Sequence, residues 1–236
     1  MSQAKKVFTR MCLNNWGGID HKVLEFHEYV NLFSGKSGSG KSTVMDAIQV
    51  ILYGSFSPSF LNKAADDAKN RRSVLSYLRG EQKDGSANRK DCDFCSVIAL
   101  EIEDTGTHII TCIGIAFEVR KSDSEIKKFV YFSHSGKMPE SEYLTEQGVC
   151  YSNQEIKKLV SARTKSDDNR GKGEVNRIYG SKEAYLGTLY DVILGYIDQN
   201  RFITMEKSAI ALKMTNGTGQ FIRDYMFPKN TSNTIA

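Results

Sequence analysis

The sequence has no apolar run that approaches the roughly 20 residues of a membrane-spanning helix. Its most apolar stretch, 109–117, is short and interrupted. The amino end carries no secretory signal, and the five cysteines are odd in number. These absences argue against a membrane span, an exported chain and a disulfide framework. We therefore expect a soluble protein of the reducing cytoplasm.

The chain also has little excess charge of either sign. Its 32 Lys and Arg residues against 28 Asp and Glu residues give a formal net charge of +4. A balance this small does not by itself predict nucleic-acid binding. With 236 residues, 40% of them hydrophobic, the chain is large enough for one globular domain or one lobe of a larger one.

The amino-terminal region has the order strand, glycine-rich loop, helix. Short strands are predicted at 7–13, 23–26 and 30–34, the first two joined by a turn at 16–18. The third strand leads directly into the loop. Beyond it, apolar residues recur at helical spacing from Ser42, and Gly54 stands where a carboxy-terminal cap belongs.

The glycine-rich loop has the Walker A pattern of a glycine, four free positions, glycine, lysine and serine or threonine. Its residues are Gly35, Lys36, Ser37, Gly38, Ser39, Gly40, Lys41 and Ser42. The glycines let backbone amides converge on phosphate oxygens at a helix amino terminus, whose dipole favours anions. Lys41 is expected between the β- and γ-phosphates, Ser42 on a Mg²⁺ ion shared with the nucleotide, and Thr43 in the helix. The pattern predicts binding of ATP with Mg²⁺.

The rest of the chain divides into four kinds of segment. We expect a polar insertion or lid at 63–90, an antiparallel meander at 92–103, 108–120 and 127–133, a mobile linker at 163–173, and helices at 183–194 and 220–227.

The surroundings of the loop carry a family resemblance. GKSTVMDAI at 40–48, preceded by LNNWGGI at 13–19, resembles the heads of SMC-type and RecF/SbcC-type ATPases of the ATP-binding cassette branch. The segments 63–80, 200–214 and 218–228 are most similar to the condensin-like JetC ATPases of Wadjet anti-plasmid systems, and more distantly to MukB proteins.

This resemblance implies an α/β P-loop fold, with a mixed sheet that carries the loop and an antiparallel β-layer beside it. It implies ATP hydrolysis in the complete protein, driving a condensin-like DNA machine in plasmid defence. The implied partners are the carboxy-terminal half of the same head or a second head, other subunits of a defence complex, and duplex DNA. A RecF-, RecN- or SbcC-like repair ATPase and a non-catalytic, nucleotide-switched assembly module remain as alternatives.

The family's signature motif and Walker B carboxylates have no counterpart that we can identify. Glu101, Glu103 and Asp104 end a half-apolar strand and are more typical of a solvated strand end. We therefore assign no catalytic residue. Residues 1–236 are predicted to be the amino-terminal lobe of a head, in which 220–236 begin the coiled-coil connection.

Other residues have a functional and a structural interpretation. Arg71 and Arg72 are candidate phosphate contacts or solvated arginines, and Gln220 is a candidate Q-loop residue for which Gln199 competes. Trp16, with Asn14 and Asn15, lines the adenine or belongs to the core.

Two further groups complete the candidates. Cys92 and Cys95 form a lone CxxC, which fits a half-buried core better than zinc because zinc needs four ligands. A basic segment is a candidate contact for DNA phosphates; it comprises Lys63, Lys69, Arg71, Arg72, Arg79, Lys83, Arg89 and Lys90.

Overall fold

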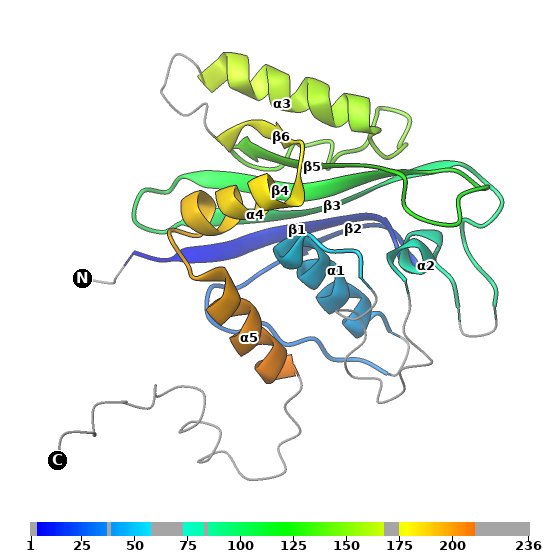
Figure 1. Ribbon diagram of the computed structural model, residues 1–236, viewed down its shortest axis with the longest axis horizontal. Coiled ribbons are helices and arrows are strands. Elements are labelled where there is room, and N and C mark those ends of the chain that lie inside the picture. The colour runs from blue at the N-terminus through cyan, green and yellow to red at the C-terminus, as the bar shows by residue number, and fades with distance from the viewer. Residues whose placement is uncertain (1–3, 37–38, 58–72, 83–84, 168–174, 211–236) are drawn as a thin grey trace, which may run out of the picture. The chain divides into compact units, whose positions relative to one another are not determined.

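The computed structural model describes residues 4–36, 39–57, 73–82, 85–167 and 175–210. The chain divides into a unit that ends at Ile197 and a second unit that begins at Asp198. In the second unit the described structure is a single helix, α5 (Gln199–Ile210). The strands and the remaining helices all belong to the first unit (Figure 1).

The first unit is built on one six-stranded sheet in the order β2-β1-β3-β4-β5-β6. Every neighbouring pair is antiparallel. The strands are β1 (Lys6–Trp16), β2 (Ile19–Glu25), β3 (Phe94–Asp104), β4 (Ile110–Val119), β5 (Lys128–Ser135) and β6 (Arg177–Tyr179). The predicted hairpin at 7–26 and the predicted antiparallel meander are therefore confirmed.

Helices cover both faces of this sheet (Figure 1). On one face lie α1 (Lys41–Tyr53), α2 (Val74–Arg79), α4 (Lys182–Gly187) and a π-helical segment, η4 (Thr188–Ile193). On the other face lies α3 (Asn153–Asp167), which buries Ile156 and Val160 against the sheet. Because β3 and β4 are covered on both sides, they are buried along most of their length.

Helix α1 is bounded by two glycines in left-handed conformation, Gly40 (φ 88) and Gly54 (φ 52). This confirms the predicted helix and its carboxy-terminal cap. Its last turn contains no basic residue. Instead, tyrosine hydroxyls donate to the carbonyl oxygens there: Tyr185 to Ile51 at 2.9 Å, Tyr190 to Leu52 at 2.9 Å, and Tyr131 to Gly54 at 2.6 Å.

The predicted strand at 30–34 is wrong, because no described residue of this segment belongs to a strand. Val30 and Leu32 have the alternation of a strand, but they are 76% and 88% exposed. A strand needs a neighbour, and this segment pairs with neither edge strand of the sheet, β2 or β6. The described residues accordingly form an entirely antiparallel sheet, and the predicted mixed sheet is not among them.

Two predicted irregular segments contain ordered helix. Within the expected lid at 63–90, α2 buries Val74, Leu75, Tyr77 and Leu78, so this part of the segment builds the core. Residues 163–167 form the last turn of α3, so the expected linker does not begin at 163. Residues 63–72, 83–84, 168–173 and 220–236 lie outside the described part of the chain.

The turn between β1 and β2 is packed against the start of α1. The Gly17 amide donates to the Tyr77 carbonyl at 2.8 Å, and the Gly17 carbonyl accepts from the Arg89 guanidinium. Gly17 has φ 59, and a Cβ there would lie 2.5 Å from Cγ2 of Thr43. Gly18 has open space around it. The turn thus contacts the nucleotide loop's helix at a position that only glycine fits.

We predict that Gly17→Ala lowers the free energy of unfolding by about 1–3 kcal/mol, because it adds backbone strain and a clash with Thr43. Gly18→Ala is the matched control and should change it by less than about 0.5 kcal/mol, as at a typical surface site. Urea unfolding of the three proteins measures both values. Equal effects of the two substitutions would contradict the proposed contact with α1.

Candidate nucleotide-binding site

The glycine-rich loop takes the backbone conformations that its sequence requires. Gly35 has φ 152, and a Cβ there would lie 2.6 Å from the Ser39 hydroxyl oxygen. Gly40 has φ 88 at the start of α1, which excludes most other residues on conformation alone. Ser37 and Gly38 lie outside the described residues.

The Lys41 ammonium points back into the loop. It donates to the Gly35 carbonyl at 2.6 Å, to the Lys36 carbonyl at 2.9 Å and to the Ser39 hydroxyl at 3.2 Å. The oxygen atoms of the loop itself therefore surround the ammonium and hold it within the loop.

The amino terminus of α1 is suited to an anion. No side chain caps it, and its first turn contains no acidic residue. The first amides of a helix have no partner within the helix and carry the positive end of its dipole. The Ser42 side chain is exposed beside them, so its hydroxyl can reach a Mg²⁺ ion carried by a phosphate chain. The predicted continuation of the helix through Thr43 is confirmed.

The first turn of α1 is held from behind by two aromatic residues. The indole Nε1 of Trp16 donates to the Thr43 carbonyl at 2.8 Å, and its ring stacks on Tyr77 with centroids 5.1 Å apart. The Tyr77 hydroxyl donates to Asp46, a buried residue of α1. The core interpretation of Trp16 is correct, because its side chain is fully buried. The adenine interpretation is therefore wrong.

The neighbouring asparagines also make structural contacts. The Asn14 amide donates to the Glu142 carbonyl at 2.8 Å, and the Asn15 amide donates to the Cys95 carbonyl at 2.7 Å. Neither side chain is available to a nucleotide base.

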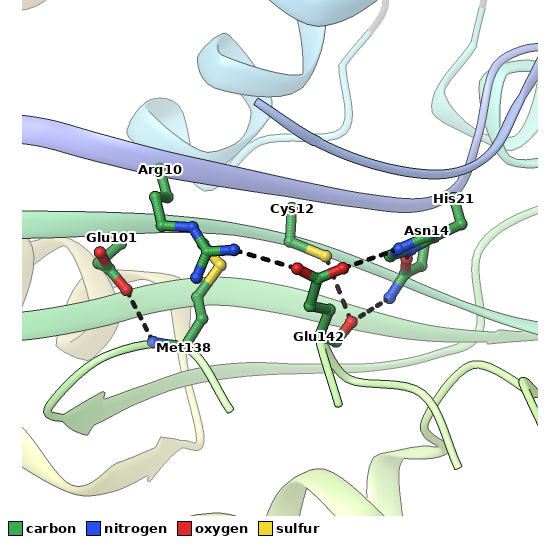
Figure 2. Close-up of polar contacts among 7 residues, drawn as sticks. All are labelled: Arg10, Cys12, Asn14, His21, Glu101, Met138 and Glu142. Atoms are coloured by element: carbon green, nitrogen blue, oxygen red, sulfur yellow. Dashed lines mark hydrogen bonds and ion pairs between the residues drawn. The ribbon is translucent and has the colours of Figure 1, made fainter. Parts of the chain in front are cut away.

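The carboxylates at the end of β3 have other roles. Glu101 is 2% exposed and accepts from the Thr9 hydroxyl at 2.8 Å. It also accepts from the Met138 amide at 2.7 Å (Figure 2). It shares the α3 face of the sheet with Ala99, since alternate strand residues share a face, and α1 lies on the opposite face. The solvated interpretation of Glu101 is wrong, but its location also rules it out as the carboxylate of the loop.

The other two acidic residues of this strand end make local contacts. Asp104 pairs with Lys6 at 2.6 Å and accepts from the Gly106 amide of the next turn, while Glu103 pairs with His108 at 2.9 Å.

Several candidates cannot be placed beside the loop. Arg71, Arg72 and Gln220 lie outside the described residues. Gln199 is the first residue of α5, in the second unit. They remain predictions.

Two arginines of the basic segment at 63–90 make structural contacts and are not free to bind DNA phosphates. Arg89 is 6% exposed and donates to the Leu78 carbonyl at 2.9 Å and to Asp20 at 2.7 Å. Arg79 donates to the Lys121 carbonyl at 3.1 Å. Both guanidinium groups therefore tie α2 to its neighbours, and only Lys90 is an exposed, described cation of that segment. Lys63, Lys69, Arg71, Arg72 and Lys83 lie outside the described residues.

Sequence reasoning missed the contact of Gly17 and Tyr77 with α1. The Gly17-Gly18 pair signalled a turn, but nothing local indicated what the turn packs against. Asp46 belongs to the quoted motif, yet its burial beneath Tyr77 depends on a residue 31 positions away.

The described residues contain no cluster of three or more His, Cys, Asp or Glu residues arranged to hold a metal ion. Cys92 is exposed before β3, whereas Cys95 is half-buried within it. None of the helices described here has both the length and the apolar character needed to cross a bilayer.

Comparison with known proteins gives the loop a family context. Residues 8–68 match a family model described as the P-loop containing region of an AAA domain. A 74-residue stretch, 30% of the chain, is 34% identical to the SbcC subunit of nuclease SbcCD from Staphylococcus haemolyticus (strain JCSC1435) and spans 6% of that protein. Residues 8–68 are thus similar to a P-loop containing region, and the predicted P-loop fold class is confirmed.

Two solved structures show limited overall similarity, each at 16% sequence identity. One comes from work on ATP-driven dimerization and DNA-stimulated activation of SMC ATPases; it has a TM-score of 0.33 and covers 70% of this chain and 84% of that chain. The other is the recombination mediator RecF with ATP, with a TM-score of 0.35 and coverage of 94% of this chain and 48% of that chain.

The reactivity of the cysteines tests the packing of the sheet, in or beside which four of the five are buried or half-buried. Burial raises the pKa of Cys95 to about 11 and that of Cys12 to about 12, and it raises the pKa values of Cys112 and Cys150 further. We predict that iodoacetamide at neutral pH labels Cys92 alone among the five in the native protein, because thiolate is the reactive form. Mass spectrometry reads the sites, and Cys92→Ser should abolish native labelling. Fast labelling of Cys12 would contradict the described packing.

Proposed function

We propose that this chain binds ATP with Mg²⁺ on the loop 35–43. The observation that carries the proposal is the Lys41 ammonium, held inside a Walker A loop at the uncapped amino terminus of α1. On nucleotide binding the ammonium exchanges its carbonyl partners for β- and γ-phosphate oxygens, which are stronger acceptors because they are charged. The Ser42 hydroxyl holds Mg²⁺, whose charge offsets that of the phosphates.

Hydrolysis belongs to a larger assembly in this proposal. Among the described residues, Lys36 and Lys41 of the loop form no ion pair with a carboxylate. Phosphoryl transfer requires a group that orients water. The segment that leads into the loop exposes Tyr29 at 70%, Val30 at 76% and Leu32 at 88%. An apolar, unpaired segment beside the site supports a complementing partner. We propose the carboxy-terminal half of the same head or a second head.

The finer function rests on the resemblance of the sequence to JetC. We propose that the assembled cytoplasmic ATPase drives a condensin-like DNA machine in anti-plasmid defence, with the other subunits of a Wadjet complex. The 34% identity to SbcC favours a second candidate, a DNA repair ATPase. The rate of plasmid loss in cells that carry a Lys41→Ala allele, compared with wild type, separates the two: only the defence function predicts a change.

Replacement of Lys41 by Ala tests nucleotide binding directly. We predict that Lys41→Ala weakens Mg²⁺–ATP binding by about 1.5–3 kcal/mol, the value of a charge-assisted contact in a shielded site. Lys121→Ala removes the same charge from an exposed turn and should leave the affinity unchanged. Titration calorimetry measures all three proteins. Equal affinity for wild type and Lys41→Ala would refute the assigned role.

A DNA contact is supported by the exposed face of α3. Lys157, Lys158 and Lys165 lie along this face over two turns, and they line an open hollow of about 580 Å³ with Gln154, Ser161 and Ala162. None of these lysines forms an ion pair with another described residue. Unpaired cations on one helix face, with small side chains between them, fit a phosphate backbone. We propose that duplex DNA lies on this face.

The salt dependence of DNA binding tests the α3 surface. We predict that changing Lys157, Lys158 and Lys165 to Ala reduces the slope of log affinity against log salt by about 0.9 for each phosphate that is no longer neutralised. A control with Lys22, Arg120 and Lys121 changed to Ala removes equal charge elsewhere and should keep the slope. Fluorescence anisotropy with a labelled duplex gives both slopes. Equal reductions in the two variants would show that general charge, and not α3, binds the DNA.

A further inference from the structure

On the α3 face of the sheet, a polar cluster joins the β1–β2 hairpin to the loop 136–144 (Figure 2). Glu142 is at its centre. Its carboxylate contacts the Arg10 guanidinium at 3.0 Å and Nε2 of His21 at 2.9 Å, and its backbone carbonyl accepts from the Asn14 amide at 2.8 Å and from the Cys12 thiol at 3.4 Å. We call these five residues the Glu142 latch.

Both ring nitrogens of His21 face acceptors. Nδ1 lies 2.6 Å from the side-chain oxygen of Asn14, and Nε2 lies 2.9 Å from the Glu142 carboxylate. The Asn14 amide orientation is fixed, because its nitrogen must donate to the Glu142 carbonyl. A neutral imidazole carries one N–H and would leave one acceptor facing a lone pair. Only the imidazolium satisfies both contacts.

His134 provides the contrast within the same chain. Its Nδ1 faces the Ser135 carbonyl at 3.0 Å, an acceptor, but its Nε2 faces the Tyr143 hydroxyl at 2.9 Å, which can donate. One donor and one acceptor suit a neutral ring. Burial agrees with this assignment, since it lowers the pKa of His134 to about 4.

We infer that His21 is a positioning residue that acts as an imidazolium, fastening the Glu142 loop to the hairpin that supports the nucleotide helix. Asn14 and His21 are a cross-strand pair, and the next pair on that side of the turn is Trp16 and Ile19. Trp16 in turn holds the Thr43 carbonyl of α1 at 2.8 Å. The latch therefore fixes the Asn14–His21 pair, which is next to Trp16, the residue that contacts the Walker A helix.

The loop's own conformation requires such fastening. Glu142 has φ 51 and Tyr143 has φ 61, so two consecutive non-glycine residues are left-handed. This conformation is unfavourable for both residues and persists only where surrounding contacts hold it. Tyr143 is held by full burial in the α3-side core, and Glu142 is held by the latch.

The charges around His21 set the effect of pH. Among the residues of β1, His21 contacts the neutral Asn14, and Arg10 pairs with the same Glu142 carboxylate as His21 does. Burial raises the pKa of Cys12 to about 12, so that thiol is uncharged. From the loop, His21 faces Glu142. Its own edge strand adds Asp20 and Lys22, one residue away on the opposite face. When His21 loses its proton, the Arg10–Glu142 pair remains and the latch keeps one of its two cations.

Nitrogen NMR of the histidine rings tests the protonation state. At one fixed pH, the ring nitrogens of His21 should have more N–H character in wild type than in Glu142→Gln, whereas those of His134 should be the same in both proteins. His21→Gln assigns the signals among the four histidines. Equal N–H character of His21 in the two proteins would overturn the inference.

A double-mutant cycle with His21→Gln and Glu142→Gln tests the latch itself. At about pH 6 the coupling should change the unfolding equilibrium constant about two- to fivefold, as for a partly exposed ion pair. It should vanish at about pH 9, where histidine is neutral. Coupling of equal size at both pH values would refute the charged latch.

The link to nucleotide rests on the proposed function and has a separate readout. Between the same two pH values, wild type should lose ATP affinity about twofold more than Glu142→Gln, which already lacks the carboxylate charge that pairs with His21. Parallel pH profiles for the two proteins would refute the positioning role. Absence of ATP binding in wild type would refute the proposed function, while the NMR and coupling results would still decide the state of His21.

Discussion

The contact between Trp16 and the first turn of α1 is the constraint on which the nucleotide loop depends. The indole donates to the Thr43 carbonyl, Tyr77 stacks on the indole and bonds Asp46, and Gly17 fits against Thr43. A hairpin turn and a short helix far away in the sequence thereby set the position of the helix that presents Lys41. The geometry of the loop is a product of tertiary packing as much as of its glycines.

The sequence alone predicted those elements whose conformation is determined by local contacts. Gly40 and Gly54 bound α1 because left-handed conformations favour glycine, and the meander follows a period of two. It failed where partners are distant. Val30 and Leu32 alternate like a strand but pair with neither edge of the sheet. Arg89 has the sequence context of a surface cation, yet carbonyl acceptors supplied by two other segments bury it.

The sheet separates two kinds of surface in the first unit. One face carries the loop and α1, where backbone amides and the Lys41 ammonium suit an anion of compact shape. The other carries α3, where separated lysine side chains on flexible stems suit an extended polyanion. The β1–β2 hairpin contributes to both faces, since Trp16 contacts α1 while Asn14 contacts the Glu142 loop. Any communication between the two faces has a physical route through this hairpin.

The three tyrosine hydroxyls at the far end of α1 have a thermodynamic consequence for the site. A lysine or histidine at that end would also donate to the carbonyls, but a lysine would add a positive charge there and a histidine would change its charge with pH. The tyrosines are neutral, and burial raises the pKa of Tyr131 to about 12 and raises those of Tyr185 and Tyr190 as well. The anchorage of the helix is therefore constant over the whole range in which a triphosphate changes its ionisation.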